Sequence, residues 1–211
     1  VYNQQVDGLL LQVEEAPSTG FSSKWANAGS MKTDGVELGV TLNPVRSKAF
    51  NWLSKTTFYT SKAEITELKV DPYNTGGFAT FLGAYRIEKG WDPHTIVGAE
   101  LDENGKHVKL GSETPDFMMG FNNRVSFGDV SVVAHFDWKK GGQNVNLQEL
   151  IADLGGTTYD FDDKGLDPEE NLNNGPYRLA NLGSITAPYV QDAGYFRLSE
   201  LSVMYSLPKS M

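Results

Sequence analysis

Cysteine is absent from this chain of 211 residues, and positive charge is scarce, with 18 Lys and Arg against 27 Asp and Glu. Without cysteine the chain has neither a disulfide framework nor a thiolate metal site. A formal net charge of −9 argues against nucleic-acid binding, because basic patches supply most of the affinity for phosphates. No stretch approaches the roughly 18 consecutive apolar residues of a membrane-spanning helix. A disulfide scaffold, a nucleic-acid-binding protein and a helical membrane protein are therefore disfavoured.

Aromatic residues make up 11% of the chain, which argues against disorder, and many lie in segments where apolar residues recur at every second position. The segment 35–43, for example, alternates Val and Leu with Glu, Gly and Thr. This period is typical of a strand with one apolar and one polar face. The predicted strands are 1–13, 35–43, 50–68, 117–127, 130–139 and 194–207, of which 1–13 and 50–68 are the least regular.

The connections between these strands alternate between short and long. Gly128-Asp129 is a two-residue hairpin signal, and Asn43–Ala49 is another short link. The other connections, 14–34, 69–116 and 140–193, exceed the loop lengths usual in compact domains. An outer-membrane barrel has this order, with short periplasmic turns and long extracellular loops. The sequence therefore predicts an all-β fold: part of an antiparallel transmembrane β-barrel of about six meander strands, incomplete as given.

Aromatic residues fall at the ends of the predicted strands, where interfacial girdles of a barrel lie. The expected positions are Tyr2, Trp52, Phe127 and Tyr205 near the periplasmic turns, and Phe117, Trp138 and Tyr195 near the outer loops. The lipid-facing side chains should include Val36, Leu38, Val132, Ala134, Phe136 and Leu201. Aromatic placement alone fits the core of a soluble β-protein equally well.

Two of the long loops contain local structure of their own. Asn104-Gly105 predicts a small hairpin with a type I′ turn. The segment 146–155 predicts a short helix with Asn146 as its cap and Gly155 at its end. Leu147, Leu150, Ile151 and Leu154 share one face of this helix, and we expect that face to be buried against neighbouring loops or a lid protein.

Several segments, taken in order, resemble the C-terminal barrel of SusC/RagA-like TonB-dependent outer-membrane transporters. They are STGF (18–21), NAGSMKTDGVEL (27–38), FNW (50–52), TPDFMMGFNN (114–123), WKKGGQNVNL (138–147) and DAGYFRLSELSVMYSLP (192–208). The resemblance covers essentially the whole chain. It implies that residues 1–211 are a C-terminal barrel segment, with the plug domain and the final strands lying outside the chain.

The resemblance also implies a function, which is not enzymatic and uses no cofactor. Members of this family import oligosaccharides or peptides across the bacterial outer membrane, energised by TonB and covered by a SusD-like lid lipoprotein. The implied partners are the rest of the barrel and its plug, that lipoprotein, the TonB complex through the plug, outer-membrane lipid and the cargo. The alternatives are a soluble or surface carbohydrate-binding β-sandwich module and, less favoured by the ordered motifs, a passive porin.

Candidate site residues fall into three groups. Strand parity places five polar residues toward the lumen: Arg124, His135, Asp137, Lys139 and Glu200. Four loop aromatics are candidates for cargo contact, because aromatic rings stack on sugars and anchor ligands: Tyr73, Phe78, Tyr85 and Trp91. No metal site is predicted. Asp160, Asp162 and Asp163 are clustered carboxylates, the ligands that calcium favours. They are only weak calcium candidates, because Asn171 stands where an EF-hand needs its twelfth-position carboxylate.

Overall fold

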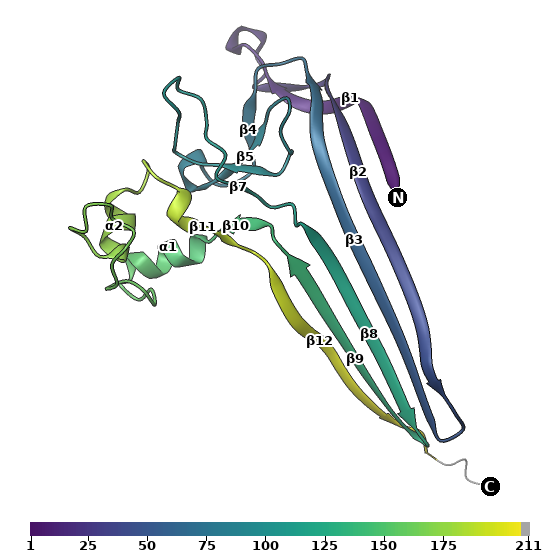
Figure 1. The fold of residues 1–211 in the computed structure, drawn as a ribbon. Coiled ribbons are helices and arrows are strands. Elements are labelled where there is room, and N and C mark those ends of the chain that lie inside the picture. The colour runs from purple at the N-terminus through teal and green to yellow at the C-terminus, as the bar shows by residue number, and fades with distance from the viewer. Residues whose placement is uncertain (208–211) are drawn as a thin grey trace.

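The computed structural model describes residues 1–207, and its main feature is one long antiparallel sheet in which strands adjacent in sequence lie side by side (Figure 1). The six strands are β1 (Tyr2–Glu14), β2 (Ser23–Arg46), β3 (Phe50–Leu68), β8 (Phe117–Phe127), β9 (Val130–Lys140) and β12 (Tyr195–Tyr205). The prediction of an all-β meander of six strands is confirmed. Pro208, the last residue of the sequence motif, lies outside the described residues.

β2 is much longer than the sequence suggested. The predicted loop 14–34 is wrong over most of its length, because residues 23–34 continue β2 and pair with β1. Small and polar residues there, such as Ala26, Ala28 and Ser30, do not alternate as apolar and polar residues do in the other strands, so the sequence pattern does not indicate a strand. Backbone hydrogen bonds to β1 and β3, not burial of a regular apolar face, hold this half of β2 in the sheet. The connection shrinks to residues 15–22, which include the 3₁₀ turn Pro17–Thr19.

The long β2 also moves Tyr2 from its expected position. Tyr2 pairs with Gly35, which in turn pairs with Ser61, so it lies toward the loop end of the sheet rather than at the short turns. Its ring covers Gly35, where an added Cβ would overlap the ring atoms. Sequence parity gave the strand but not its register, which depends on residues 23–34 being paired.

Two short turns join strands at the opposite end. Ser47 to Ala49 connect β2 to β3, and Ser47 N–H donates to the Phe50 carbonyl at 2.8 Å. Pro44 lies in an irregularity of the β2–β3 register between Leu42 and Val45, where a residue without an N–H is tolerated. The predicted Gly128-Asp129 turn is confirmed, and Gly128 adopts the positive φ of 55° that such turns need.

The loop between β3 and β8 folds into a small four-stranded sheet. Its elements are β4 (Tyr73–Thr75), η2 (Thr80–Leu82), β5 (Ala84–Ile87), β6 (Thr95–Val97) and β7 (Gly111–Ser112). The predicted hairpin at residues 102–106 forms, but its turn is not type I′, because Asn104 does not have positive φ. The Asp102 carboxylate accepts hydrogen bonds from the N–H groups of Asn104 and Lys106, and only Gly105 is left-handed. Local capping by Asp102 therefore selects a three-residue turn.

The loop between β9 and β12 carries the helices. Its elements are β10 (Gln143–Val145), α1 (Leu147–Leu154), α2 (Asn174–Ala180), η3 (Ala187–Tyr189) and β11 (Val190–Asp192). The predicted helix is confirmed, since the Asn146 side chain accepts the Glu149 N–H at 3.1 Å. Within residues 1–207, no helix has the length and apolar content needed to cross a membrane.

The sheet and the loops bury apolar residues differently. Leu38, Leu42, Leu201 and Val203, on the six-stranded sheet, are each more than half exposed. No second sheet covers them among the described residues, as a β-sandwich would require, so the sandwich alternative is wrong. The loops instead contain a small conventional core, with Ile96 and Val97 almost completely buried.

Candidate functional site

The six-stranded sheet separates apolar and polar side chains onto opposite faces. In β9, Ala134, Phe136 and Trp138 alternate with His135 and Asp137, and the register places like residues beside like on β8 and β12. A register shift between Leu198 and Glu200 keeps both Leu198 and Leu201 on the apolar face although they are three residues apart. Strict alternation along β12 would have placed Leu198 and Leu201 on opposite faces.

Aromatic rings cross the apolar face near the loop end. Phe58 stacks on Phe117 at 5.8 Å between ring centroids, and Phe117 meets Trp138 edge-on at 5.0 Å. Phe196 continues the row, with centroids 6.5 Å from Trp138 and 5.5 Å from Phe136. Such pairs add to the stability given by burial alone. One aromatic band therefore ties β3, β8, β9 and β12 together.

A second set of aromatics, Trp52, Phe127 and Tyr205, lies near the short turns. Phe117 and Phe127 are ten residues apart on one strand, about 33 Å at the usual rise per residue. With a strand tilt of about 40°, this corresponds to about 25 Å along a barrel axis, the usual height of the apolar band of an outer-membrane barrel. The two aromatic sets therefore have the spacing of interfacial girdles.

One polar residue interrupts the apolar face, and the structure provides its partner. Asn123 shares this face with Phe121 and Val125. The Trp52 indole N–H donates to its side-chain oxygen at 3.1 Å. In hydrocarbon an unpaired amide costs several kcal/mol, so this hydrogen bond makes the position tolerable.

Charged residues end the apolar face on the side of the long loops. Lys32 and Asp34 continue the parity of Val36 and form an ion pair at 2.9 Å, and Lys62 lies opposite Asp34. β2 has 24 residues, whereas about 9–11 suffice to cross a bilayer. Residues 23–34 therefore project beyond the apolar band toward the loops.

The five residues expected on the lumen side, Arg124, His135, Asp137, Lys139 and Glu200, share the polar face. His135 Nε2 is 3.1 Å from an Asp137 oxygen, and Asp137 also contacts Ser199 and Arg197. Arg124 and Glu200 line a hollow of about 370 Å³. This connected polar face is suited to water or to a polar protein surface.

The two long loops are joined at a buried threonine. Thr186 is 1% exposed, and its hydroxyl donates to the Phe81 carbonyl and accepts the Ala99 N–H, both at 2.9 Å. The Glu100 carboxylate accepts the backbone N–H groups of Thr186 and Ala187 at 2.7 Å each. The loops therefore form one structural unit, a feature that the sequence did not indicate.

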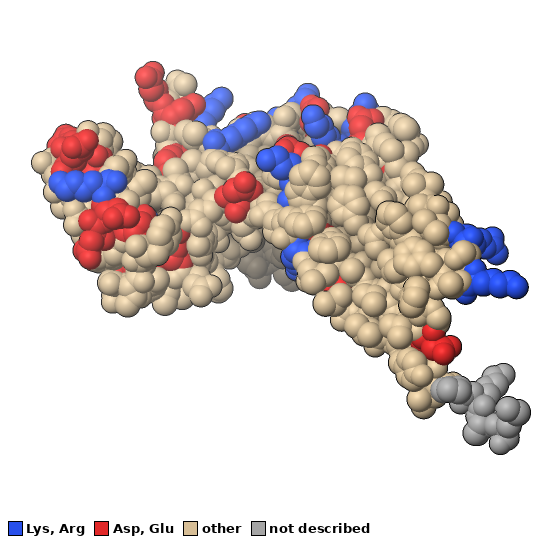
Figure 2. Space-filling view, turned by 60° about the horizontal axis from the view of Figure 1, so that its bottom comes forward, with Lys and Arg blue, Asp and Glu red and all other residues tan. Residues whose placement is uncertain are grey.

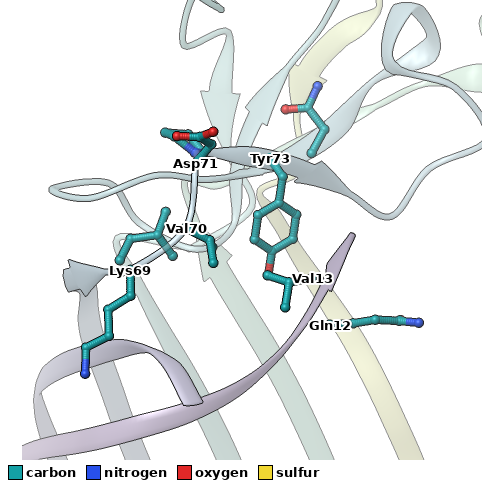
Figure 3. Close-up of a pocket in the computed structure, with 9 residues that line it drawn as sticks. Gln12, Val13, Lys69, Val70, Asp71 and Tyr73 are labelled. Atoms are coloured by element: carbon teal, nitrogen blue, oxygen red, sulfur yellow. The ribbon is translucent and has the colours of Figure 1, made fainter. Parts of the chain in front are cut away.

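A large cavity lies where this loop unit meets the strand ends, and Figure 3 shows it from close by. It measures about 930 Å³ and is lined by Gln12, Val13, Leu68, Lys69, Val70, Asp71, Pro72, Tyr73 and Asn74. The Tyr73 ring points toward Val13 of β1, whereas the Gln12 side chain extends away (Figure 3). Burial raises the pKa of the Tyr73 hydroxyl above its usual value. Tyr73 therefore combines an aromatic face and a polar tip at a cavity large enough for a ligand.

The other three candidate aromatics do not join Tyr73. The Tyr85 hydroxyl donates to Glu113 at 2.6 Å, which raises the pKa of Tyr85 to about 12. Trp91 is covered by the Lys109 ammonium, 4.3 Å from the ring centroid. Phe78 is 88% exposed and lines a separate small hollow that Tyr85 also borders. The four candidates therefore do not form a single site.

The loop between β9 and β12 is rich in acids and is organised by Arg178, a residue that the sequence did not single out. Arg178 is 2% exposed, and its guanidinium donates to Asp153 at 2.7 Å and to Asp160 at 2.8–2.9 Å. These bonds hold the pKa of the Asp160 carboxyl below its usual value. In turn, the carboxylates of Asp153 and Asp160 raise the pKa of the Arg178 guanidinium. Between residues 140 and 193 the sequence has nine acids and only a few bases. A base within so acidic a segment was the available sequence signal for such a pairing.

The same ion cluster decides which side of α1 is buried. Glu149 and Asp153 are buried against Arg178, whereas Ile151 and Leu154 are 69% and 67% exposed. The expectation that Ile151 and Leu154 are buried is therefore wrong within this chain, because the ion cluster occupies the inner side of the helix. Figure 2 shows acidic side chains gathered on the projecting lobe that carries α1 and α2.

The weak calcium candidates are not gathered around a common point. Asp160 is engaged by Arg178, while Asp162 and Asp163 are exposed. Asp167 accepts the backbone N–H groups of Glu169, Asn171 and Leu172, so it caps its own turn. Across residues 1–207 there is no group of three His, Asp or Glu side chains with metal-binding geometry.

A single long six-stranded sheet with a banded apolar face, a polar opposite face and long loops at one end defines a segment of a transmembrane β-barrel wall. No family model matches the chain. TonB-dependent receptors P26 and P3 of Formosa agariphila are 27% and 25% identical to it, over 98% and 99% of the chain and 25% of each relative. The RagAB peptide transporter aligns over 98% of the chain and 26% of its own, with a TM-score of 0.65 and 18% identity, which shows the fold.

The chain is thus homologous, over nearly its whole length, to a portion of a TonB-dependent receptor, and spans about a quarter of the relatives it matches. TonB-dependent receptors sit in the bacterial outer membrane, which confirms the localisation expected from the sequence. They are transporters rather than enzymes, so the homology also confirms a non-enzymatic class.

Proposed function

We propose that this chain forms part of the C-terminal barrel wall of an outer-membrane importer, with the apolar face against lipid and the polar face toward the lumen. The observation that carries the proposal is the sheet with opposite faces, whose apolar face is bounded by two aromatic sets about 25 Å apart. On this basis the long loops are extracellular, and Arg124, His135, Asp137, Lys139 and Glu200 face water or a plug.

The cargo we propose is an oligosaccharide or a peptide, taken up with TonB energy and beneath a SusD-like lipoprotein. Homology to TonB-dependent receptors and the likeness to the two-protein RagAB peptide importer support this proposal. Within this chain, the cavity around Tyr73 is the best-placed cargo contact, because it opens where the long loops meet the outer ends of the strands. Lys69 and Asp71 add both signs of charge to its lining, which suits a polar or zwitterionic ligand.

Uptake by the complete receptor tests this function. Fluorescent oligosaccharide and peptide pools are offered to cells with the receptor gene intact, deleted or restored. We expect one pool to enter only with the receptor and to stop entering when a protonophore removes the energy that TonB uses. Uptake that survives the protonophore would instead indicate a passive pore.

A pair of variants then tests the cavity. Tyr73→Ala should lower the apparent affinity for cargo, because the ring and its hydroxyl are lost from the cavity. Phe21→Ala is the matched control, since Phe21 is an exposed aromatic on the short connection between β1 and β2. Equal affinities in the two variants would remove Tyr73 from the cargo path without affecting the importer assignment.

A further inference from the structure

The short strand β4 forms part of the wall of the cavity around Tyr73. It has three residues, lies at the edge of its sheet and pairs with β5, with Asn74 opposite Arg86. Tyr73 and Asn74 both line the cavity. So short an edge strand makes few backbone hydrogen bonds, and its position therefore depends on the side-chain hydrogen bonds of Asn74.

The Asn74 amide has a partner at each end. Its Oδ1 accepts from Arg86 Nη1 at 2.9 Å, and its Nδ2 lies 3.2 Å from Thr80 Oγ1 and 3.1 Å from His107 Nε2. A guanidinium can only donate, so the amide oxygen must face Arg86 and the amino group must face His107. An amino group also can only donate, so His107 Nε2 must accept. The network therefore requires a neutral imidazole that carries its proton on Nδ1.

A second proton on the His107 ring would remove this contact. It would sit on Nε2 and turn that atom into a donor facing the Asn74 amino group, which is itself a donor. The other ring nitrogen, Nδ1, is buried and has no hydrogen-bond partner among residues 1–207. A charged ring would thus lack an acceptor at both nitrogens within the described chain, which is unfavourable away from water.

The charged groups near His107 do not offset a positive ring. On β5, Arg86 is a cation bonded to the same Asn74 amide, and the nearby Glu88 is already paired with Arg86 at 3.1 Å. In the hairpin that carries His107, Lys106 is a second cation, and the Asp102 carboxylate accepts backbone N–H groups of its own turn. Neither β4 nor η2 contributes a charged side chain. The surroundings therefore favour the neutral form of His107.

We propose that His107 makes the cavity around Tyr73 sensitive to pH. The neutral ring holds Asn74 and keeps β4 in place, whereas the protonated ring releases Asn74 and loosens this wall of the cavity. Because the ordered wall favours the form with fewer protons, the contact is present at neutral pH and is lost as the pH falls below neutrality, where histidine gains a proton. The regulation of cargo binding rests on the proposed function, but the loosening of β4 does not.

Hydrogen exchange on the complete receptor tests the loosening of β4. Amide protection of residues 73–75 and 84–87 is compared at about pH 7.5 and pH 5.5 after correction for the intrinsic effect of pH. We expect protection to fall about threefold to tenfold at the lower pH, the effect of losing one hydrogen bond. His107→Gln keeps an acceptor for Asn74 but does not titrate, so its protection should be equal at both pH values. His94→Gln, at an exposed histidine of the same loop, should keep the wild-type decrease.

Two outcomes of that experiment overturn the proposal. One is wild-type protection that does not change with pH, and the other is a decrease that persists in His107→Gln. Either result leaves the cavity itself as a candidate cargo site, because Tyr73→Ala tests that assignment separately.

Cargo affinity gives the second test. The fluorescent pool that enters with the receptor is labelled with a pH-insensitive dye and titrated at both pH values. Wild-type affinity should fall about threefold to tenfold at the lower pH, and the affinity of His107→Gln should not. If protection of β4 falls while affinity stays constant, the cavity does not hold the cargo, and the regulation falls together with that part of the proposed function.

Discussion

The six-stranded sheet exposes apolar side chains, whereas the unit formed by the two long loops buries them. On the sheet, Leu201 and Val203 are turned outward and polar residues such as His135 lie on the other face. In the loops, Ile96 and Val97 are buried, together with the charged Arg178 and its carboxylate partners. The same chain therefore follows two rules of burial, and the environment decides which applies, since lipid replaces a protein core on one face of the sheet.

The comparison is tested most strongly by removing the buried charge in the loops. Arg178→Ala leaves Asp153 and Asp160 without their partner and should destabilise the lobe formed by residues 146–189 by about 3–5 kcal/mol. Hydrogen exchange on the complete receptor should show loss of protection over residues 146–189 and none in the six long strands. Lys164→Ala, at an exposed cation of the same loop, is the control. A lobe that keeps its protection would show that packing alone holds it.

The apolar sheet face is tested by adding a charge to it. Ala134→Arg should cost about 2–4 kcal/mol if this position lies near the middle of the membrane. Val133→Arg, one residue away on the polar face, should cost much less. Urea unfolding of the receptor in lipid vesicles measures both. Equal costs would contradict the assignment of the two faces.

A smaller effect is expected at the polar residue within the apolar face. Trp52→Phe removes the indole donor to Asn123 and should destabilise the barrel by about 1 kcal/mol beyond the loss of packing. Asn123→Leu in the same background should recover that part. A double-mutant cycle that gives no coupling energy would mean that the Asn123 amide finds another partner.

The smallest effect at neutral pH concerns Glu149. Burial raises the pKa of Glu149, so its ionised form costs stability, and protonation as the pH falls restores it. Below about pH 4 the sign reverses, because Arg178 lowers the pKa of Asp160 and that ion pair is lost as the pH falls through this lower value. Hydrogen exchange of the lobe should therefore show greater stability at pH 5 than at pH 7.5, and Glu149→Gln should abolish this difference. Equal stability of the wild-type lobe at pH 5 and at pH 7.5 would contradict a raised pKa of Glu149.

The candidate site was accessible from the sequence only in part. Polar residues on β8, β9 and β12 could be assigned to one face because alternation is a local property. The separation of Tyr73 from Tyr85, Phe78 and Trp91 could not be foreseen. Tyr85 and Trp91, for example, are engaged by Glu113 and Lys109, which lie elsewhere in the chain. The joining of the loops through Thr186 and Glu100 likewise depends on contacts more than 80 residues apart.

The sequence by itself determined the six strands, their order, the Gly128-Asp129 turn and the helix capped by Asn146, because alternation, turn chemistry and capping act over a few residues. Only the tertiary structure decided the length of β2 and the position of Tyr2, since both follow from pairing with β1. It also decided which side of α1 is buried. A helix pattern identifies an apolar stripe but not its partner, and here Arg178, 25 residues from Asp153, draws the acidic side inward.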